Sequence, residues 1–262
     1  MKILIYSDAA TASAETARRI AAKLVSSPCA VLGLATGGTM KPVYAALLGQ
    51  LGRGPATFTS FNLDEYVGLP PTHPQSYAHY MRTHLFDALQ LPADRAHLPR
   101  GDAADPMAEA DRYEAAIRAA GGIDLQLLGL GANGHIGFNE PTSSLGSRTR
   151  VKTLTRKTVA DNARFFASGE TVPRLAITMG IATILDAKEI LLLATGSGKS
   201  RAVAQMIEGP LSAACPASAL QLHARVTILI DAAAAEDLQL RDYYETVHPG
   251  GLDDSMIRPV GV

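Results

Sequence analysis

Short apolar runs, separated by longer segments with helical periodicity, constrain the fold of this chain more than any other feature. The runs are rich in Ile, Leu and Val and seldom alternate with polar residues, which is typical of parallel strands covered on both faces. The predicted strands are Lys2–Tyr6, Ala30–Ala35, Phe58–Leu63, Ile123–Leu130, Arg174–Met179, Ile190–Ala194 and Val226–Ile230.

Helical patterns lie between these runs. Ala17, Ile20, Ala21, Leu24 and Val25 follow the i, i+3, i+4 spacing of a buried helix face, and Asp8 is a suitable N-cap before them. The other predicted helices are Pro42–Leu51, Gln75–Leu89, Ala104–Ala120, Gly198–Ile207 and Ala232–Leu240.

The alternation of strands and helices predicts an α/β protein, a three-layer sandwich with a mostly parallel, Rossmann-like central sheet. No internal repeat or linker divides the 262 residues, so a single domain over residues 1–262 is expected.

Composition excludes several classes of function. A formal net charge of −1 gives no basic field for nucleic acid or an anionic membrane. Two cysteines, Cys29 and Cys215, cannot build a disulfide framework or the usual zinc cage. No apolar stretch approaches the roughly 20 residues of a membrane helix, and the run in Met1–Asp8 is too short for a signal peptide. We therefore expect a cytoplasmic protein.

Polar or glycine-rich motifs follow four of the predicted strands directly. They are Thr36–Thr39, Asp64–Tyr66, Gly131–Pro141 and Thr195–Ser200. Because ligands bind at the carboxyl ends of the strands in such sheets, the four motifs predict a single site.

The segment Gly131–Pro141 has the composition of an acid/base loop. A histidine is a common proton-transfer group, and Glu140 can orient the imidazole ring of His135 and hold its proton. Residues 129–134 also match the dinucleotide pattern G-x-G-x-x-G, but a second bend with Gly137 and Pro141 follows where that fingerprint needs a helix.

Two other loops suit an anion. Residues 36–39 precede a helix, so their backbone N–H groups and hydroxyls could bind phosphate, although a tight turn that requires glycine explains them equally well. Residues 195–200 imitate the end of a nucleotide P-loop, but Leu193 stands where that loop needs its first glycine. ATP binding is therefore disfavoured, while Lys199 can still reach a phosphate.

Asp64 and Glu65 form an acidic pair at a strand end, which suits a general base, a metal ligand or a turn cap. The seven histidines show no paired ligand spacing, so no metal is expected. The basic stretch from Arg148 to Arg164 is either a solvated face or part of an anion site.

Together these motifs resemble the glucosamine/galactosamine-6-phosphate isomerase family, and most closely its glucosamine-6-phosphate deaminases. The resemblance extends to about residue 245. The loop at residues 36–39 is shared with the lactonase relatives, whereas Asp64–Tyr66 and Gly134–Pro141 are specific to this family. The matching segments are Leu34–Thr39, Phe61–Gly68, His73–Tyr77, Gly131–Pro141, Ser147–Arg150, Asn162–Phe166 and Leu220–His223.

The resemblance implies conversion of glucosamine 6-phosphate and water to fructose 6-phosphate and ammonia, without a cofactor. By resemblance, Asp64 moves a proton from C2 to C1, and His135 opens the sugar ring, oriented by Glu140 and Asn133. Some members of the family carry aspartate at position 133. Since an amide cannot take the proton, we predict that His135 is held less strongly as imidazolium here.

The same resemblance implies ligand sites. The phosphate would be bound by Thr36, Gly37, Gly38, Thr39, Arg164 and Lys199. Some hexameric members bind N-acetylglucosamine 6-phosphate at an allosteric site, which Ser143, Ser144, Arg148, Arg150, Lys152 and Thr153 resemble. The segment after Tyr244 departs from those members, so both activation and a homohexamer are left open.

Three alternatives remain at this point. A 6-phosphogluconolactonase shares the glycine loop, but the spacing of His135 and Glu140 favours the deaminase. A non-catalytic sugar-phosphate sensor would not need Asp64, His135 and Glu140 together. The same reaction on galactosamine 6-phosphate is compatible with every motif.

Overall fold

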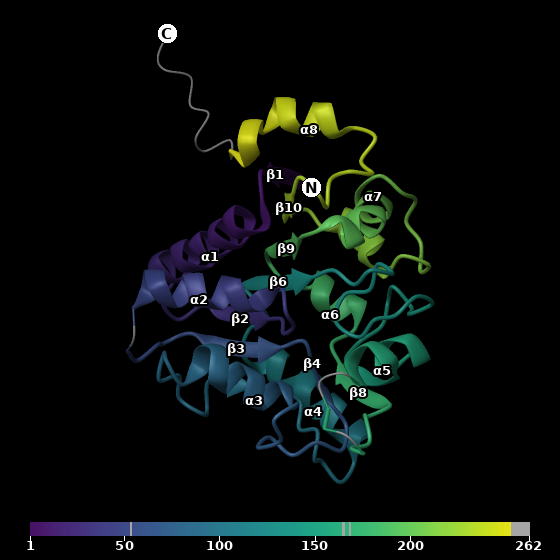
Figure 1. Ribbon diagram of the computed structural model, residues 1–262. Helices are drawn as coiled ribbons and strands as arrows, with labels where there is room; N and C mark the ends of the chain where they lie inside the picture. Colours follow the sequence, from purple (N-terminus) through teal and green to yellow (C-terminus); the bar gives the residue numbers. More distant parts are fainter. Residues whose placement is uncertain (53, 164–165, 168, 253–262) are drawn as a thin grey trace.

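The computed structural model describes residues 1–52, 54–163, 166–167 and 169–252. Its centre is a seven-stranded sheet in the order β1-β10-β9-β6-β2-β3-β5, in which every pairing is parallel (Figure 1). The strands are β1 (Lys2–Tyr6), β2 (Val31–Leu34), β3 (Thr59–Asn62), β5 (Ala96–His97), β6 (Leu125–Gly129), β9 (Ile190–Ala194) and β10 (Val226–Asp231).

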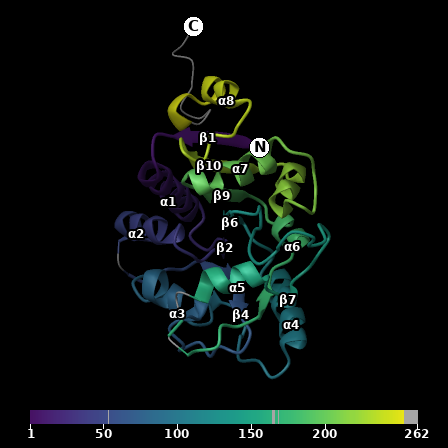
Figure 2. The ribbon, with the colours of Figure 1, turned by 45° about the vertical axis from the view of Figure 1, so that its right-hand side comes forward.

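Helices cover both faces of this sheet. Figures 1 and 2 show α1 (Ala9–Ser26) and α2 (Met40–Leu51) on one side, and α6 (Ile181–Leu185) and α7 (Ser200–Ile207) on the other. This arrangement confirms the predicted α/β sandwich with a mostly parallel central sheet. The remaining helices are α3 (Tyr77–Met81), α4 (Pro106–Ala119), α5 (Arg156–Ala163) and α8 (Arg241–Val247), with the π-helix η1 (Arg82–Phe86) and the 3-10 helices η2 (Ser197–Lys199), η3 (Pro216–Leu222) and η4 (Pro249–Gly251).

Helix α1 begins where the sequence predicts. The Asp8 carboxylate accepts the backbone N–H of Thr11 at 2.8 Å, which caps the first turn. Ile20 and Leu24 lie buried against the sheet, whereas Val25, which the pattern placed on the same face, is 78 % exposed. No helix of the described residues is long and apolar enough to cross a membrane.

A second, three-stranded antiparallel sheet has the order β4-β8-β7. Its strands are β4 (Asp64–Tyr66), β8 (Leu175–Thr178) and β7 (Arg150–Thr153). The strand predicted at Arg174–Met179 therefore exists, but its expected place in the parallel sheet is wrong. The chain bends at Leu63, whose backbone oxygen accepts the N–H of Met179, so β4 leaves the central sheet and pairs with β8 instead.

The helix predicted at Ala232–Leu240 is wrong, because these residues form turns and the helix starts only at Arg241. The alanines satisfy helix propensity, but two carboxylates fix a different path. Asp231 accepts the N–H of Ala234, and Glu208 accepts the N–H groups of Gln239 and Leu240.

The helix predicted at Gln75–Leu89 is shorter and less regular than expected. It starts at Tyr77, because Ser76 caps it by accepting the N–H of His79. From Arg82 it continues as a π-helix, and turns follow Phe86.

Candidate active site

Four loops meet at one edge of the central sheet. Strands β9, β6, β2 and β3 are consecutive neighbours and parallel, so their carboxyl ends lie on the same side. The segments that leave these ends are Thr195–Ser200, Gly131–Pro141, Thr36–Thr39 and Asp64–Tyr66, the four motifs that the sequence marks.

Asp64 lies at the bend between the two sheets, and its side chain is only 6 % exposed. The loop after β6 passes directly over the carboxylate: a Cβ on Gly137 would lie 3.3 Å from Asp64 Oδ2 and 3.0 Å from Thr178 Oγ1. The backbone φ of Gly137 is +56°, so this close crossing requires glycine. Burial, with the nearby Glu65 carboxylate, raises the pKa of Asp64 to about 8.

Glu65 has a structural role: it caps helix α3. Its carboxylate accepts the backbone N–H groups of Tyr66, Tyr77 and Ala78 at 2.9, 3.0 and 2.9 Å. Of the interpretations that the sequence allowed for the acidic pair, the turn cap describes Glu65, whereas Asp64 is left facing the glycine loop.

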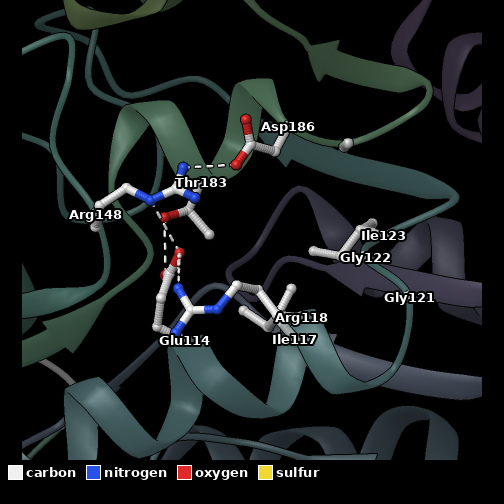
Figure 3. A pocket seen from close by; sticks show the side chains of 10 residues that line it. Glu114, Ile117, Arg118, Gly121, Gly122, Ile123, Arg148, Thr183 and Asp186 are labelled. Atoms are coloured by element: carbon white, nitrogen blue, oxygen red, sulfur yellow. Dashed lines mark hydrogen bonds and ion pairs between the residues drawn. The ribbon is translucent and has the colours of Figure 1, made fainter.

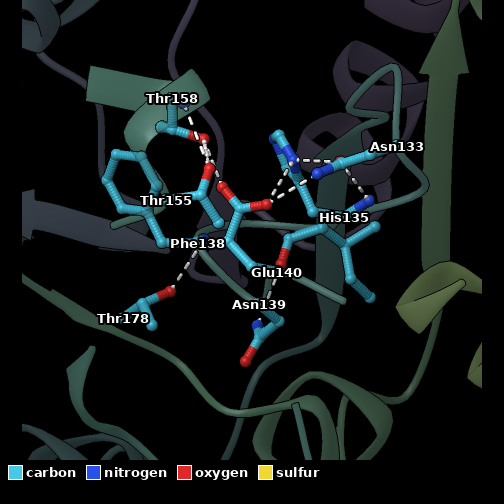
Figure 4. Close-up of polar contacts among 9 residues, drawn as sticks. Asn133, His135, Phe138, Asn139, Glu140, Thr155, Thr158 and Thr178 are labelled. Atoms are coloured by element: carbon cyan, nitrogen blue, oxygen red, sulfur yellow. Dashed lines mark hydrogen bonds and ion pairs between the residues drawn. The ribbon is translucent and has the colours of Figure 1, made fainter. Parts of the chain in front are cut away.

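His135, Asn133 and Glu140 form a hydrogen-bonded relay (Figure 4). His135 Nδ1 lies 2.6 Å from Asn133 Oδ1, and Asn133 Nδ2 donates to Glu140 Oε2 at 2.7 Å. The direct separation of His135 Nδ1 from Glu140 Oε2 is 3.6 Å. The amide therefore stands between the imidazole and the carboxylate.

The relay fixes the imidazole tautomer. Asn133 Oδ1 also faces the backbone N–H of His135 at 3.3 Å, so the oxygen, and not the amide nitrogen, points to the histidine. Because a carbonyl oxygen only accepts, Nδ1 must carry a hydrogen. In the neutral ring, Nε2 is then the free acceptor, as a proton-transfer group requires.

Glu140 is 1 % exposed and is held as a carboxylate. Burial opposes its ionisation, but the nearby His135 ring and the hydrogen bonds from Thr158 and Asn133 outweigh burial and lower the pKa of Glu140 to about 2. The Thr158 hydroxyl reaches Glu140 Oε1 from α5 (Figure 4).

The absence of a side chain at Gly131 makes room for the imidazole ring of His135. A Cβ at this position would lie 2.3 Å from ring atoms of His135, so no larger residue fits. The glycines of the loop thus let the backbone approach two reactive side chains, His135 through Gly131 and Asp64 through Gly137.

The loop at residues 36–39 leaves the N-terminus of helix α2 without a side-chain cap. Thr39 makes no side-chain cap bond to α2, and Gly37 and Gly38 are exposed, so N–H groups of the first turn face solvent. The Tyr80 hydroxyl donates to the backbone oxygen of Gly37 at 2.7 Å and holds the loop from α3.

Lys199 ends η2, on the loop after β9. Burial lowers its pKa, and no carboxylate of the described residues pairs with its ammonium group. Arg164, the other predicted phosphate ligand, lies outside the described residues.

The residues that resemble an allosteric site are divided between different contacts. Arg148 forms ion pairs with Asp186 at 2.6 Å and Glu114 at 3.0 Å. Arg150 Nη1 instead donates to Asn139 Oδ1 at 2.9 Å, on the acid/base loop.

The other residues of that group lie on two different segments. Ser143 is buried, and Ser144 Oγ accepts the N–H of Gly146. Lys152 and Thr153 follow Arg150 along β7.

A cavity of about 340 Å³ lies at the opposite edge of the sheet (Figure 3). Gly122 and Ile123, which precede β6, and Ala187, which precedes β9, contribute to its lining, so it opens at the amino ends of the strands. Arg148 and Glu114 face it, but none of the acid/base residues does. This cavity is therefore separate from the candidate active site.

Sequence reasoning missed two residues of the site. Thr158 supports Glu140, and the Thr178 hydroxyl accepts the backbone N–H of Phe138 at 3.1 Å. Neither lies near the motifs in sequence, and a single threonine in a helix or strand carries no local signal. In the part of the chain that the structure describes, no group of three or more His, Cys, Asp or Glu side chains could hold a metal ion.

A parallel sheet with a buried carboxylate and a histidine relay at its carboxyl edge defines an α/β protein with a proton-transfer site. The family profile described as glucosamine-6-phosphate isomerases/6-phosphogluconolactonase matches residues 7–229. The chain belongs to this family.

Individual relatives agree with the family. The glucosamine-6-phosphate deaminase of Shewanella loihica is 55 % identical over 250 residues, 94 % of this chain and 93 % of the relative. That of Rhodopirellula baltica is 53 % identical over 244 residues, 92 % and 97 % of the two chains.

Solved structures show the same fold. A monomeric glucosamine-6-phosphate deaminase superimposes with a TM-score of 0.87 at 45 % identity, covering 90 % of this chain and 100 % of the other. The 6-phosphogluconolactonase of Trypanosoma brucei has a TM-score of 0.69 at 22 % identity, over 90 % and 98 % of the two chains, a likeness of fold alone.

Proposed function

We propose that this chain is an enzyme that converts glucosamine 6-phosphate and water to fructose 6-phosphate and ammonia. The observation that carries the proposal is the meeting of a buried Asp64 with the loop that bears the His135 relay. The reaction needs one proton-transfer group for ring opening and another for isomerisation, and the two groups are suited to these steps.

Ring opening is assigned to His135. Its free Nε2 can take the proton of the anomeric hydroxyl and return one to the ring oxygen. Imidazolium formed in this step is stabilised by the relay, because Asn133 accepts from Nδ1 while Glu140 supplies a negative charge 3.6 Å away.

Isomerisation is assigned to Asp64. The open-chain aldehyde loses its C2 proton to the carboxylate, and the resulting enaminol regains a proton at C1. One carboxylate can serve both carbons because they are bonded to each other. Water then adds to the C2 iminium group, and ammonia leaves to give the ketose.

Substrate phosphate is assigned to the loop at Thr36, Gly37, Gly38 and Thr39, with Lys199 from the neighbouring loop. The open N-terminus of α2 and an ammonium group without a described carboxylate partner support this assignment. Arg164 is retained as a ligand on the resemblance alone.

Ammonia release from glucosamine 6-phosphate tests the proposal, with galactosamine 6-phosphate and 6-phosphogluconolactone as comparison substrates. We expect ammonia and fructose 6-phosphate from the first substrate. Lactone hydrolysis without ammonia release would assign the chain to the other branch of the family.

Regulation by N-acetylglucosamine 6-phosphate within a homohexamer stays a prediction, as does the cytoplasmic location. Arg150 and Lys152 keep the residue types of the allosteric site, but Arg148 is occupied by two carboxylates, and the solved relative at 45 % identity is described as monomeric. Sedimentation with and without the N-acetylated sugar phosphate would decide between the two states.

A further inference from the structure

Asp64 is surrounded by groups that cannot neutralise it. The titratable side chains that face it are Glu65 and Tyr66 on its own strand, Tyr77 on α3 and Tyr113 on α4. Across the residues that the structure describes, no ion pair joins Asp64 to a cation. The backbone N–H of Phe138 lies close to the carboxylate, but it donates to the Thr178 hydroxyl.

The neighbouring Glu65 is better supported. It accepts three backbone N–H groups, so the pair places its negative charge on Glu65 before Asp64. A second buried charge beside it is costly without a counter-ion.

These surroundings oppose the ionisation of Asp64 that the proposed proton transfer requires. A pKa of about 8 leaves Asp64 mainly protonated at neutral pH, and a protonated carboxyl group cannot take the C2 proton. The missing positive charge must enter the site from outside the described residues.

We propose that the ammonium group on C2 of the bound amino sugar is the counter-ion that ionises Asp64, so that the base forms only in the complex. The inference rests on the proposed function, in which Asp64 approaches C2. The ammonium nitrogen is bonded to that carbon, so it lies beside the carboxylate in any productive complex. As the ligand binds, the carboxyl proton leaves to solvent and a carboxylate–ammonium pair forms.

The arrangement makes the amine a condition for catalysis. A sugar phosphate with a hydroxyl or an N-acetyl group at C2 can occupy the phosphate loops, but it brings no positive charge to Asp64. Such a ligand leaves the base protonated and the C2 proton in place.

Proton release on binding tests the inference directly. Titration calorimetry at pH 7, in buffers of different ionisation enthalpy, compares 2-amino-2-deoxyglucitol 6-phosphate with glucitol 6-phosphate. Both carry the phosphate, so its contribution cancels, and only the first carries an ammonium group. We expect the amino polyol to release about 0.9 proton more per site, the protonated fraction of a group with a pKa of about 8.

Two variants serve as controls. Asp64→Asn should abolish the difference between the two ligands, and Asp111→Asn, which changes an exposed carboxylate of α4, should keep it. The comparison of ligands on the unchanged chain needs neither variant, so a folding defect in Asp64→Asn leaves the test intact.

Equal proton counts for the two polyols, in a chain that releases ammonia from glucosamine 6-phosphate, would overturn this inference and leave the proposed function standing. No ammonia release, with neither polyol bound, would overturn both.

Discussion

At the scale of single residues, the candidate site contains two carboxyl groups in opposite environments. Glu140 is stabilised as a carboxylate by its hydrogen bonds, whereas burial holds Asp64 in the protonated form. Opposite environments for two carboxyl groups are a sign of distinct roles.

Removal of the Asp64 carboxylate should stop the isomerisation while binding persists. We expect Asp64→Asn to lower kcat by about two to four decades, because no other described side chain of the site offers a base over C2 and C1. Binding through the phosphate loops persists, so the loss should be mainly in kcat. Near-normal turnover would remove Asp64 from the mechanism.

Removal of the imidazole should affect the cyclic sugar most. His135→Gln keeps a polar group near Asn133 but loses the proton-transfer nitrogen. We expect kcat/KM for the cyclic substrate to fall by about 10²-fold or more, with a smaller loss for the open form. Equal losses for both forms would assign His135 a role other than ring opening.

The amide at position 133 is the hydrogen-bond partner of the His135 ring. In Asn133→Asp a carboxylate would face both the imidazole Nδ1 and Glu140 Oε2, at the 2.6 and 2.7 Å positions of the present amide. A second negative charge holds imidazolium more strongly, so the histidine limb of the pH–rate profile should move to higher pH. A histidine limb at the same pH in both proteins would contradict this reasoning.

At the scale of helices and strands, α5 supports the relay from outside the four loops. Thr158 donates its hydroxyl to Glu140 Oε1, a hydrogen bond to a charged and buried group. Thr158→Val should weaken the stabilisation of the Glu140 carboxylate by about 1.5–3 kcal/mol. If the transition state loses the same free energy, kcat falls by about 10- to 100-fold. Thr158→Ser keeps the hydroxyl and should retain most of the activity, and equal losses in the two variants would assign Thr158 a packing role.

How well each strand could be predicted depends on the residues that form it. Most strands of the central sheet lie within predominantly apolar runs, so their ends, and the four loops after them, could be located from sequence, whereas the two-residue β5 was not predicted. Strand β4 has only Asp64, Glu65 and Tyr66, two of them acidic, and no periodicity marks it as a strand. Its pairing with β8 is set by tertiary contact, which the sequence pattern does not contain.

Among the candidate site residues, the same limit applies. His135, Asn133 and Glu140 are close in sequence, so their meeting could be anticipated from one loop. Thr158 and Thr178 approach that loop from distant elements, and the 2.6 Å contact that fixes the imidazole tautomer is a property of the folded backbone.

At the scale of the whole molecule, a base kept protonated by burial makes stability depend on pH. The pKa of Asp64 is about 8 in the folded chain and about 3.9 in an unfolded one. The folded state therefore binds the extra proton between these values, and the contribution of Asp64 to stability, full below about pH 4, falls as the pH rises towards 8.

Asn at this position carries no charge in either state, so the stability of Asp64→Asn should not fall in this way as the pH rises. We expect the variant to gain about 1–3 kcal/mol in free energy of unfolding over the parent at pH 8, and progressively less as the pH falls towards 4. Urea unfolding at pH 4.5, 6 and 8 measures the difference, with Asp111→Asn as the exposed control. A gain that does not vary with pH would mean that the amide packs better, and not that the folded chain resists ionisation of Asp64.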